Sequence, residues 1–168
     1  MYSIWPHTSV QIDSPAPAVR CQILDDTFAP LLNSSWKFRD SKTEAMIASL
    51  ATLGKVFGLF VAEEKMPVAW MVMYRLVVLL SVLVISCHSS QGSLGMLRTD
   101  GQFRRRGFGS YLVKRVVEEA VKQGVVPYVH IEDDNLQSQE FFRILGFIKM
   151  DTAVWINHYP SDSFQRKM

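Results

Sequence analysis

The fold is decided by the stretch Thr99-Asp-Gly-Gln-Phe-Arg-Arg-Arg-Gly-Phe-Gly-Ser-Tyr-Leu112, which passes from a strand pattern into a helix pattern through a basic turn. We predict a strand over residues 93–99 and a helix from Gly107 onward. Gly107 and Gly109 let the backbone approach a ligand closely, and the first amides of a helix lack partners within it. Because these amides and the helix dipole attract anions, the turn is a candidate site for a phosphate or pyrophosphate.

Other phosphate sites are less well supported by the same residues. The chain has no Gly-Lys-Ser/Thr sequence of a Walker loop, and Leu112 stands where the dinucleotide fingerprint needs its third glycine. The arginines at 104–106 have Phe103 and Phe108 nearby for stacking on nucleic-acid bases, but a near-neutral chain gives such binding little electrostatic support. Taken alone, the turn is equally compatible with a phosphate site and with a solvated basic loop.

Upstream of the turn, apolar spacing and turn residues predict three strands, at residues 19–23, 56–62 and 68–74. The last two are predicted to form a hairpin. A helical turn opened by Asp25 and Asp26 is predicted to run as far as Trp36. A second helix is predicted from the capping box Ser41-Lys-Thr-Glu44, after which apolar residues recur at helical spacing.

Downstream of the turn, the helix that starts at Gly107 is predicted to end near Gly124, a residue suited to a helix C-terminus. Asp134 or Asn135 is predicted to cap a further helix, which Gly146 ends. The remaining predicted strands lie at 125–131 and 147–156, the latter segment supplying one or two of them. The order β-α-α-β-β-β-α-β-α-β predicts one mixed α/β sheet.

Length and composition place these elements in a single domain. The chain has 168 residues, of which 48% are hydrophobic and 20% charged, and its formal net charge is +2. These values exclude a disordered chain and give no basic field that would indicate a nucleic-acid partner. We predict a flexible leader over residues 1–18 and a folded domain over 19–168.

The two cysteines, Cys21 and Cys87, form neither a disulfide framework nor a zinc spacing. No metal site is therefore predicted. The first residues contain prolines and lack the apolar core of a secretory signal. We expect a reduced intracellular location, either cytoplasmic or mitochondrial.

An apolar run, Leu76-Val-Val-Leu-Leu-Ser-Val-Leu-Val-Ile-Ser-Cys87, accounts for the positive mean hydropathy of +0.08. Twelve residues are fewer than the ~20 that span a bilayer, so no membrane partner is predicted. Five of the twelve are β-branched, which favours a buried strand over a core helix. Without residues 76–91 the mean hydropathy would fall to about −0.1, an ordinary value for a soluble domain.

Two segments resemble the acyl-CoA signature of the GCN-five-related N-acetyltransferase (GNAT) superfamily. Arg104-Arg-Arg-Gly107-Phe-Gly109 fits its Gln/Arg-x-x-Gly-x-Gly/Ala loop. Asn135-Leu-Gln-Ser-Gln-Glu-Phe-Phe-Arg-Ile-Leu-Gly-Phe147 resembles its Asn-x-x-Ala-x-x-Leu-Tyr-x-x-x-Gly-Phe helix. The resemblance implies the fold of that superfamily: a mostly antiparallel central sheet with splayed central strands, flanked by helices.

The chain also resembles the glycine N-acyltransferase-like branch, in the C-terminal, CoA-binding half of its longer members. The segments that carry this likeness are Leu31-Leu-Asn-Ser-Ser-Trp-Lys-Phe38, Pro67-Val-Ala-Trp70, Gly95-Met-Leu-Arg-Thr99 and Tyr128-Val-His130. Taken together with the two signature segments, the resemblance extends over roughly residues 19–156, apart from residues 76–91.

This resemblance implies a binding site for acetyl-CoA or another acyl-CoA as co-substrate. The pantetheine arm would pair with the backbone at 96–99, and the loop at 104–109 with Ser110 would hold the pyrophosphate. An amide near Leu97 would polarise the thioester carbonyl. The residues expected at the donor site are Met96, Leu97, Arg98, Thr99, Arg104, Arg105, Arg106, Gly107, Phe108, Gly109, Ser110, Asn135, Ser138 and Phe142.

The acceptor implied by the resemblance is a small-molecule amine or amino acid, which attacks after a base removes its proton. Candidate catalytic residues are Ser93, His130 and Glu132. Ser93 stands where the branch carries a glutamate base, and Phe142 stands where the superfamily often has a tyrosine that protonates the leaving thiolate. These departures motivate an alternative function, a catalytically silent acyl-CoA-binding or interaction module.

Residues 76–91 have no counterpart in the resembled branch, where a short hairpin joins the flanking strands. One hypothesis is a chance insertion such as a retained intron. The alternative is an extra strand or a hydrophobic lid over the acceptor site.

Overall fold

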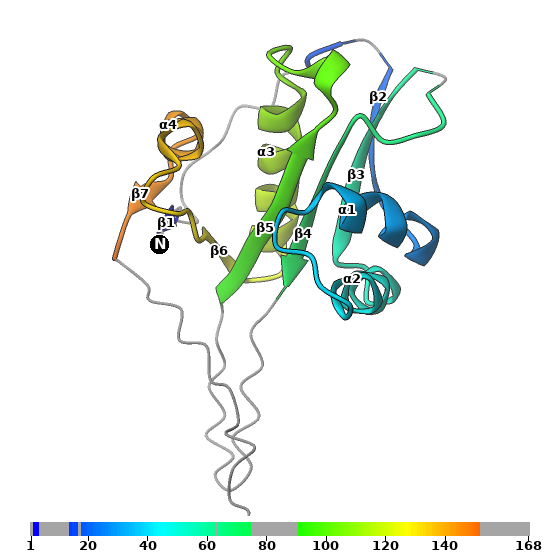
Figure 1. The fold of residues 1–168 in the computed structure, drawn as a ribbon. Coiled ribbons are helices and arrows are strands. Elements are labelled where there is room, and N and C mark those ends of the chain that lie inside the picture. The colour runs from blue at the N-terminus through cyan, green and yellow to red at the C-terminus, as the bar shows by residue number, and fades with distance from the viewer. Residues whose placement is uncertain (1, 4–13, 17, 63, 75–90, 152–168) are drawn as a thin grey trace, which may run out of the picture.

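The computed structural model describes residues 2–3, 14–16, 18–62, 64–74 and 91–151 (Figure 1). Its strands are β1 (Tyr2–Ser3), β2 (Val19–Ile23), β3 (Val56–Val61), β4 (Ala69–Tyr74), β5 (Gln91–Thr99), β6 (Val126–Val129) and β7 (Ile148–Lys149). Its helices are α1 (Ala29–Ser35), α2 (Thr43–Thr52), α3 (Phe108–Lys122) and α4 (Leu136–Ile144), with the 3-10 turns η1 (Asp26–Phe28) and η2 (Gly101–Phe103). The predicted order of elements from residue 19 onward is confirmed.

The strands form one sheet in the order β2-β3-β4-β5-β6-β1-β7. Neighbouring strands pair antiparallel except β5 and β6, which run parallel. The predicted hairpin is present as β3 and β4. Because a parallel pair needs a crossover connection, α3 links β5 to β6 across one face of the sheet. The mixed, mainly antiparallel α/β architecture predicted from the sequence is therefore confirmed.

Two apolar clusters hold helices against the two faces of the sheet. The first cluster contains the buried stripe of α3, made of Leu112, Val113, Val116, Val117 and Ala120. The second joins α1 and α2 to the opposite face and includes Trp70, Val72 and Met96 from the sheet. Burying each large apolar side chain contributes roughly 1.5–3 kcal/mol, so these two layers keep the central strands rigid.

The ends of the helices follow the predicted signals with one correction. Gly124 and Gly146 have φ angles of +67° and +88°, as expected where a helix terminates. The predicted capping box at Ser41 is wrong, because α2 begins after Lys42 and its first turn is tied to Asp40 instead. The Asp40 carboxylate accepts hydrogen bonds from the Lys42 amide and the Thr43 hydroxyl. The bond from Thr43 is the main reason that the pKa of Asp40 lies below its usual value.

One strand was not predicted by any pattern in the sequence. Tyr2–Ser3, inside the expected leader, forms β1 between β6 and β7. Its register pairs Tyr2 with Val129 on one side and with Lys149 on the other. The first residues of the chain are thereby joined to the end of the sheet beside β6.

Several sequence predictions lie outside the described residues. These include the apolar run with Cys87, all of the proposed insertion except Gln91, and any closing strand after residue 151. Within the part of the chain that the structure describes, no helix is long and apolar enough to cross a membrane. Within the same part, no group of three or more His, Cys, Asp or Glu side chains is arranged to hold a metal ion.

Candidate functional site

The central feature of the site is a bulge in β5. Trp70 on β4 pairs with Arg98 and Val72 pairs with Gly95, so one residue of β4 faces two residues of β5. The extra residue is accommodated at Met96, whose φ angle is +53°. A β-bulge bends its strand and increases the local twist, so the second half of β5 leaves the direction of the first half.

Beyond the bulge, β5 and β6 separate. Their parallel pairing runs from Gln91 with Val126 to Leu94 with Val129 and ends there. β5 continues to Thr99, and Figure 1 shows the two strands diverging from their shared end. We call this opening, between residues 95–99 and the chain after Val129, the splay. The edge of β5 that faces the splay offers backbone amides and carbonyls that the β5–β6 ladder does not use.

The turn at Gly107 opens the long helix α3 directly after β5 and η2. Gly107 is the N-cap residue and has a φ angle of +83°, a conformation that glycine adopts without strain. The first α-helical bond described at this end is from the Tyr111 amide to the Gly107 carbonyl. The amides of Phe108, Gly109 and Ser110 precede it and therefore point out of the helix end. No acidic residue lies in the first turn of α3, so nothing there repels an anion.

The three arginines before Gly107 differ in their surroundings. The Arg104 Nε donates to the Thr99 carbonyl at 3.1 Å, which ties the turn to the end of β5. The Arg106 guanidinium lies 5.6 Å and 5.5 Å from the ring centroids of Phe103 and Phe108. Arg105 has a φ angle of +57° and is exposed. The arginines therefore shape the turn and add positive charge around the end of α3.

Gly109 is required for close packing between the turn and β5. A Cβ atom at this position would meet the Thr99 Oγ1 at 2.9 Å. A Cβ atom at Gly107 would meet Pro15 at 3.4 Å, an ordinary contact, so the constraint at Gly107 is its backbone angle. The two glycines of the motif thus have different roles. Gly107 provides the positive φ angle of the turn, and Gly109 leaves room for the Thr99 side chain.

Of the residues predicted on α4, Asn135 has a clear structural role. Its side chain caps α4 by accepting a hydrogen bond from the Ser138 amide at 3.0 Å. Phe142 is 6% exposed and packs edge-on against Phe141 and Phe147 with centroid distances of 5.1 Å to both. A phenyl ring cannot supply a proton. The position where the superfamily often has a tyrosine is therefore, in this chain, a residue of the apolar core.

The candidate catalytic residues occupy different depths. Ser93 is 2% exposed and lies within the paired part of β5, opposite Tyr128. His130 and Glu132 follow the last paired residue of β6, where the splay opens. Partial burial lowers the pKa of His130 from its ordinary 6.5, so the imidazole is mainly neutral at pH 7. A neutral imidazole can accept a proton, so His130 retains the property that a base needs.

Glu132 makes a long-range contact that the sequence analysis missed. Its carboxylate forms an ion pair with Lys37, which lies in the loop after α1. The Gln139 side chain holds the same region of chain by donating to the backbone carbonyls of Glu132 and Asp133. Lys37 lies in the segment Leu31–Phe38, and nothing in the sequence links it to Glu132, a residue 95 positions away.

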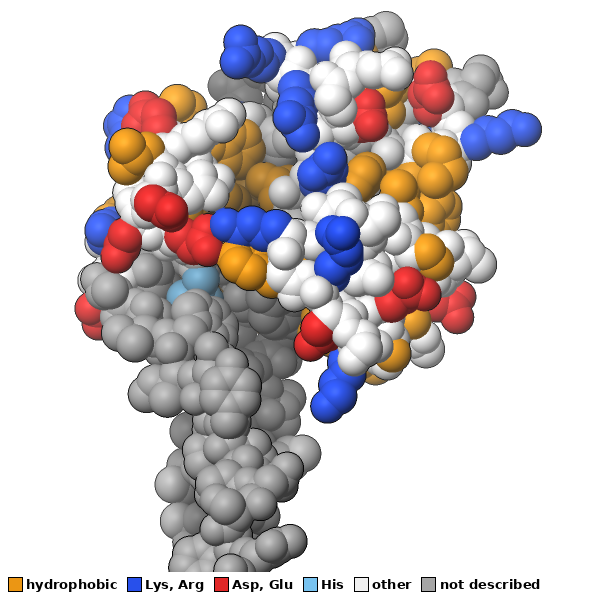
Figure 2. All heavy atoms as spheres, viewed as in Figure 1, with side chains coloured by type: hydrophobic (Ala, Val, Ile, Leu, Met, Phe, Trp, Pro, Cys, Tyr) orange, Lys and Arg blue, Asp and Glu red, His pale blue; other side chains and the backbone are white. Residues whose placement is uncertain are grey.

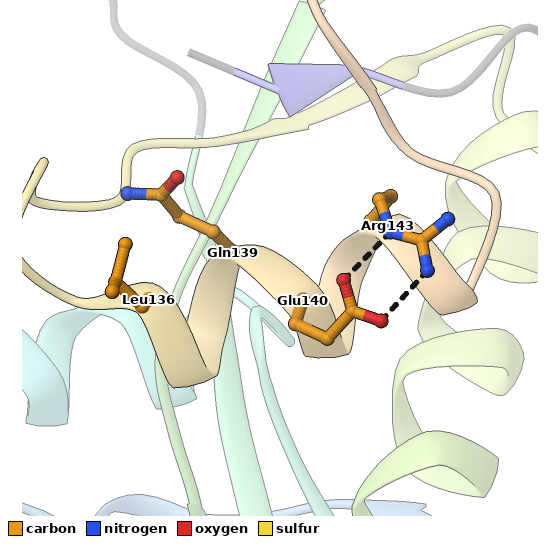
Figure 3. A pocket seen from close by; sticks show the side chains of 4 residues that line it. All are labelled: Leu136, Gln139, Glu140 and Arg143. Carbon is orange, nitrogen blue, oxygen red and sulfur yellow. Dashed lines mark hydrogen bonds and ion pairs between the residues drawn. The ribbon is translucent and has the colours of Figure 1, made fainter.

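A separate hollow of about 340 Å³ lies on α4 and is lined by Leu136, Gln139, Glu140 and Arg143 (Figure 3). Arg143 donates two hydrogen bonds to Glu140, at 2.6 Å and 2.7 Å, and these bonds lower the pKa of the Glu140 carboxyl. None of the residues predicted at the donor site or as catalytic lines this hollow. It is therefore distinct from the splay and from the turn at Gly107.

Comparison with solved structures identifies this arrangement. The chain superposes on a Drosophila protein with a TM-score of 0.70 at 16% identity, over 89% of this chain and 46% of that one. It superposes on a GNAT-family acetyltransferase from Colwellia psychrerythraea with a TM-score of 0.64 at 15% identity, over 88% and 50%. The fold is that of the GNAT acetyltransferases. Another GNAT-fold match is AAC(6′)-Iy, solved with a CoA-containing bisubstrate analogue, with a TM-score of 0.62 at 13% identity over 84% and 98%.

Comparison with protein families gives a match to the part of the chain that contains the turn and the splay. The model of the FR47-like protein family matches residues 79–156, which include β5, the turn, α3, β6 and α4. No curated protein matches the chain. The chain spans about half the length of the first two solved structures named above.

The GNAT fold places the predicted donor residues in three parts of the chain: the second half of β5, the turn before α3, and α4 with its cap, which carry Asn135, Ser138 and Phe142. The strand residues 96–99 line one edge of the splay, and the turn residues 104–110 lie at its far end, where η2 joins β5 to α3. Phe108 and Phe142 belong to the apolar core, so their side chains support the site from behind. The structural signal that the sequence did not reveal is the bulge at Met96, because a positive φ at a non-glycine residue leaves no mark in the residue pattern.

Proposed function

We propose that this chain is an acyl-CoA-dependent N-acyltransferase that transfers an acetyl or other acyl group to the amine of a small molecule or amino acid. The observation that carries the proposal is the combination of the bulged, half-unpaired strand β5 with the Gly107 turn at the start of α3. The family and fold comparisons support the same class of reaction.

The described residues fit an acyl-CoA on two counts. Gly107, at a φ angle of +83°, aims the unpaired amides of α3 out of the helix end, where they suit a pyrophosphate. The edge of β5 at residues 95–99 has backbone groups left over from the ladder, which suit the amides of a pantetheine arm. An acyl-CoA held by both would supply the activated acyl group.

The chain's own residues would supply polarisation and proton transfer. A backbone amide of β5 near Leu97 would donate to the carbonyl oxygen as negative charge develops on it. His130, neutral at pH 7, would accept a proton from the amine, directly or through water. The Glu132 carboxylate, beside His130 in the chain, would attract the cationic form of the acceptor.

A second candidate function is a silent acyl-CoA-binding module. The observation that favours it is Phe142, a buried core residue at the position where a tyrosine could protonate a leaving thiolate. In this case the turn at Gly107 binds acyl-CoA and no acyl group is transferred.

The two candidates are separated by measuring binding and turnover on the same preparation. Calorimetric titration with acetyl-CoA measures binding, and release of free thiol in the presence of a panel of amines and amino acids measures transfer. The N-acyltransferase proposal predicts both binding and amine-dependent thiol release. Binding without thiol release selects the silent module, and absence of binding contradicts both.

A further inference from the structure

We infer that Lys37 is itself an acyl acceptor, acylated by the acyl-CoA that the same chain binds. This inference rests on the proposed function, because it uses the same donor site. It assigns a modification site on the loop after α1, on the face of the sheet that carries α1 and α2.

The Lys37 ammonium lies in a small cation site built from two parts of the chain. It forms an ion pair with the Glu132 carboxylate and lies 4.5 Å from the centroid of the Phe38 ring. A carboxylate and an aromatic face are the two groups that a primary ammonium binds best. The amine of Lys37 is therefore held in the kind of site that an external amine acceptor would need.

This cation site lies at the rim of the splay. At one end of the loop, the Arg98 guanidinium of β5 donates to the Ser35 carbonyl at 3.5 Å. At the other end, Lys37 reaches Glu132, three residues after the last paired residue of β6. The segment from Ser35 to Lys37 thus crosses from β5 to the chain after β6, and Figure 1 shows the loop after α1 passing in front of β5.

The amine can leave its partner at little cost. The Lys37 and Glu132 side chains are 60% and 45% exposed, and exposed ion pairs add little to stability. Figure 2 shows acidic and basic side chains side by side on this face, open to solvent. The ion pair therefore keeps Lys37 near the splay but can break readily.

The reaction is a balanced acyl transfer. The Lys37 ammonium first gives one proton to the Glu132 carboxylate or to solvent. Its nitrogen then attacks the thioester carbonyl of the bound acyl-CoA, so that an N–C bond forms and the C–S bond breaks. The amide nitrogen loses its second proton, and CoA leaves as a thiol after its sulfur takes up a proton. The products are an uncharged amide at Lys37 and free CoA.

The test is site-resolved mass spectrometry of the intact chain after incubation with isotope-labelled acetyl-CoA. Lys122 is a matched internal control, because its side chain is also 60% exposed and is also paired with a glutamate, Glu118, at 3.0 Å. Uncatalysed acetylation affects both lysines alike. We expect Lys37 to be labelled at least about tenfold faster than Lys122, because it lies at the rim of the splay, where the donor is proposed to bind.

Two variants separate catalysis from simple exposure. Glu132→Gln should lower the labelling of Lys37 several-fold, whereas Glu118→Gln should leave the labelling of Lys122 at its uncatalysed rate. The first-order rate constant for Lys37 should not depend on protein concentration. Equal labelling of Lys37 and Lys122, in a sample that binds acetyl-CoA and acetylates a free amine, overturns this inference and leaves the proposed function intact. Absence of acetyl-CoA binding overturns both.

Discussion

The two sides of the splay are built in different ways. The proposed donor region, which comprises residues 95–99 of β5 and the turn at 104–110, offers backbone groups set by a bulge at Met96 and a positive φ at Gly107. The proposed acceptor region comprises His130 and Glu132 after β6, together with Ser93 in the paired part of β5 just before the splay, and it would use side chains. One of these, Glu132, is already paired with Lys37. If the proposed function holds, donor binding depends on main-chain geometry, whereas acceptor chemistry depends on side chains that can exchange partners.

The largest effect is expected at the acceptor side. Replacing His130 by Gln should lower kcat about a hundredfold or more while leaving the affinity for acetyl-CoA unchanged, because a general base contributes at least that much. Ser93→Ala, a change at a buried residue within the ladder, should leave kcat within a few-fold of the wild type. Steady-state thiol release with a saturating amine measures both. An equal loss of kcat in the two variants would contradict the prediction that His130, and not the buried Ser93, acts as the base.

The pH dependence gives a second view of His130. Because partial burial lowers its pKa below 6.5, the acid limb of kcat/KM should lie below that value and should disappear in His130→Gln. The sign for stability follows from the same shift. His130 binds its proton at lower pH in the folded chain than in the unfolded chain. Its contribution to the free energy of unfolding is therefore fully present above pH 6.5 and is lost as the pH falls through the lowered pKa. Denaturant melts of wild type and variant at several pH values check this.

The donor side is expected to respond to backbone changes. Gly107→Val should weaken acetyl-CoA binding by roughly tenfold to a hundredfold, since it disturbs one or two charge-assisted hydrogen bonds at the helix end. The matched control is Gly124→Val, at the other end of α3, where φ is +67° and, among the described residues other than its chain neighbours, no atom lies within 4 Å of an added Cβ. Both variants should lose about 1–2 kcal/mol of stability. Equal acetyl-CoA affinities in the two variants would contradict a role for the Gly107 turn.

The variant Phe142→Tyr tests whether the side chain at this position belongs to the core or to the proposed donor region. The Phe142 ring is 6% exposed among Phe141 and Phe147, so Phe142→Tyr should bury a hydroxyl and cost roughly 1–3 kcal/mol of unfolding free energy. Turnover should not rise. Thermal or denaturant melts together with thiol release measure the two quantities. A gain in kcat without loss of stability would place this side chain at the reacting sulfur instead of in the core.

The smallest effect is expected within the arginine turn. Arg106→Lys removes a planar cation that lies near the rings of both Phe103 and Phe108, and it should weaken acetyl-CoA binding only a few-fold, about 0.5–1 kcal/mol. Raising the salt concentration should reduce the affinity of wild type and variant alike, because the remaining arginines still act through charge. Titrations at two ionic strengths measure this. A loss as large as that of Gly107→Val would assign the pyrophosphate contact to the Arg106 side chain.

The sequence predicted the elements whose information is local. The apolar stripe of α3 and the glycines at 107 and 124 mark both ends of that helix, and the structure confirms them. Asn135 was one of two predicted caps for α4, and it is the residue that makes the capping bond. These features depend on residues within a few positions of one another, so their pattern can be recognised in the chain.

The features that were missed depend on distant or subtle partners. β1 consists of two residues that pair with strands near positions 129 and 149, and so short a segment has no periodicity. The start of α2 is tied to Asp40 instead of Ser41, because the Asp40 carboxylate reaches both the Lys42 amide and the Thr43 hydroxyl. The bulge at Met96 is set by the pairing of β5 with β4, which the residues of β5 alone do not specify.

The most direct test of the account compares acetyl-CoA with S-acetylpantetheine, which lacks the pyrophosphate, in calorimetric titrations of the wild-type chain. We expect saturable binding of acetyl-CoA at one site and at least about a hundredfold weaker binding of the shorter thioester, because the Gly107 turn is proposed to contact the pyrophosphate through charge-assisted hydrogen bonds. Equal affinities for the two thioesters, or no binding of acetyl-CoA, would contradict it.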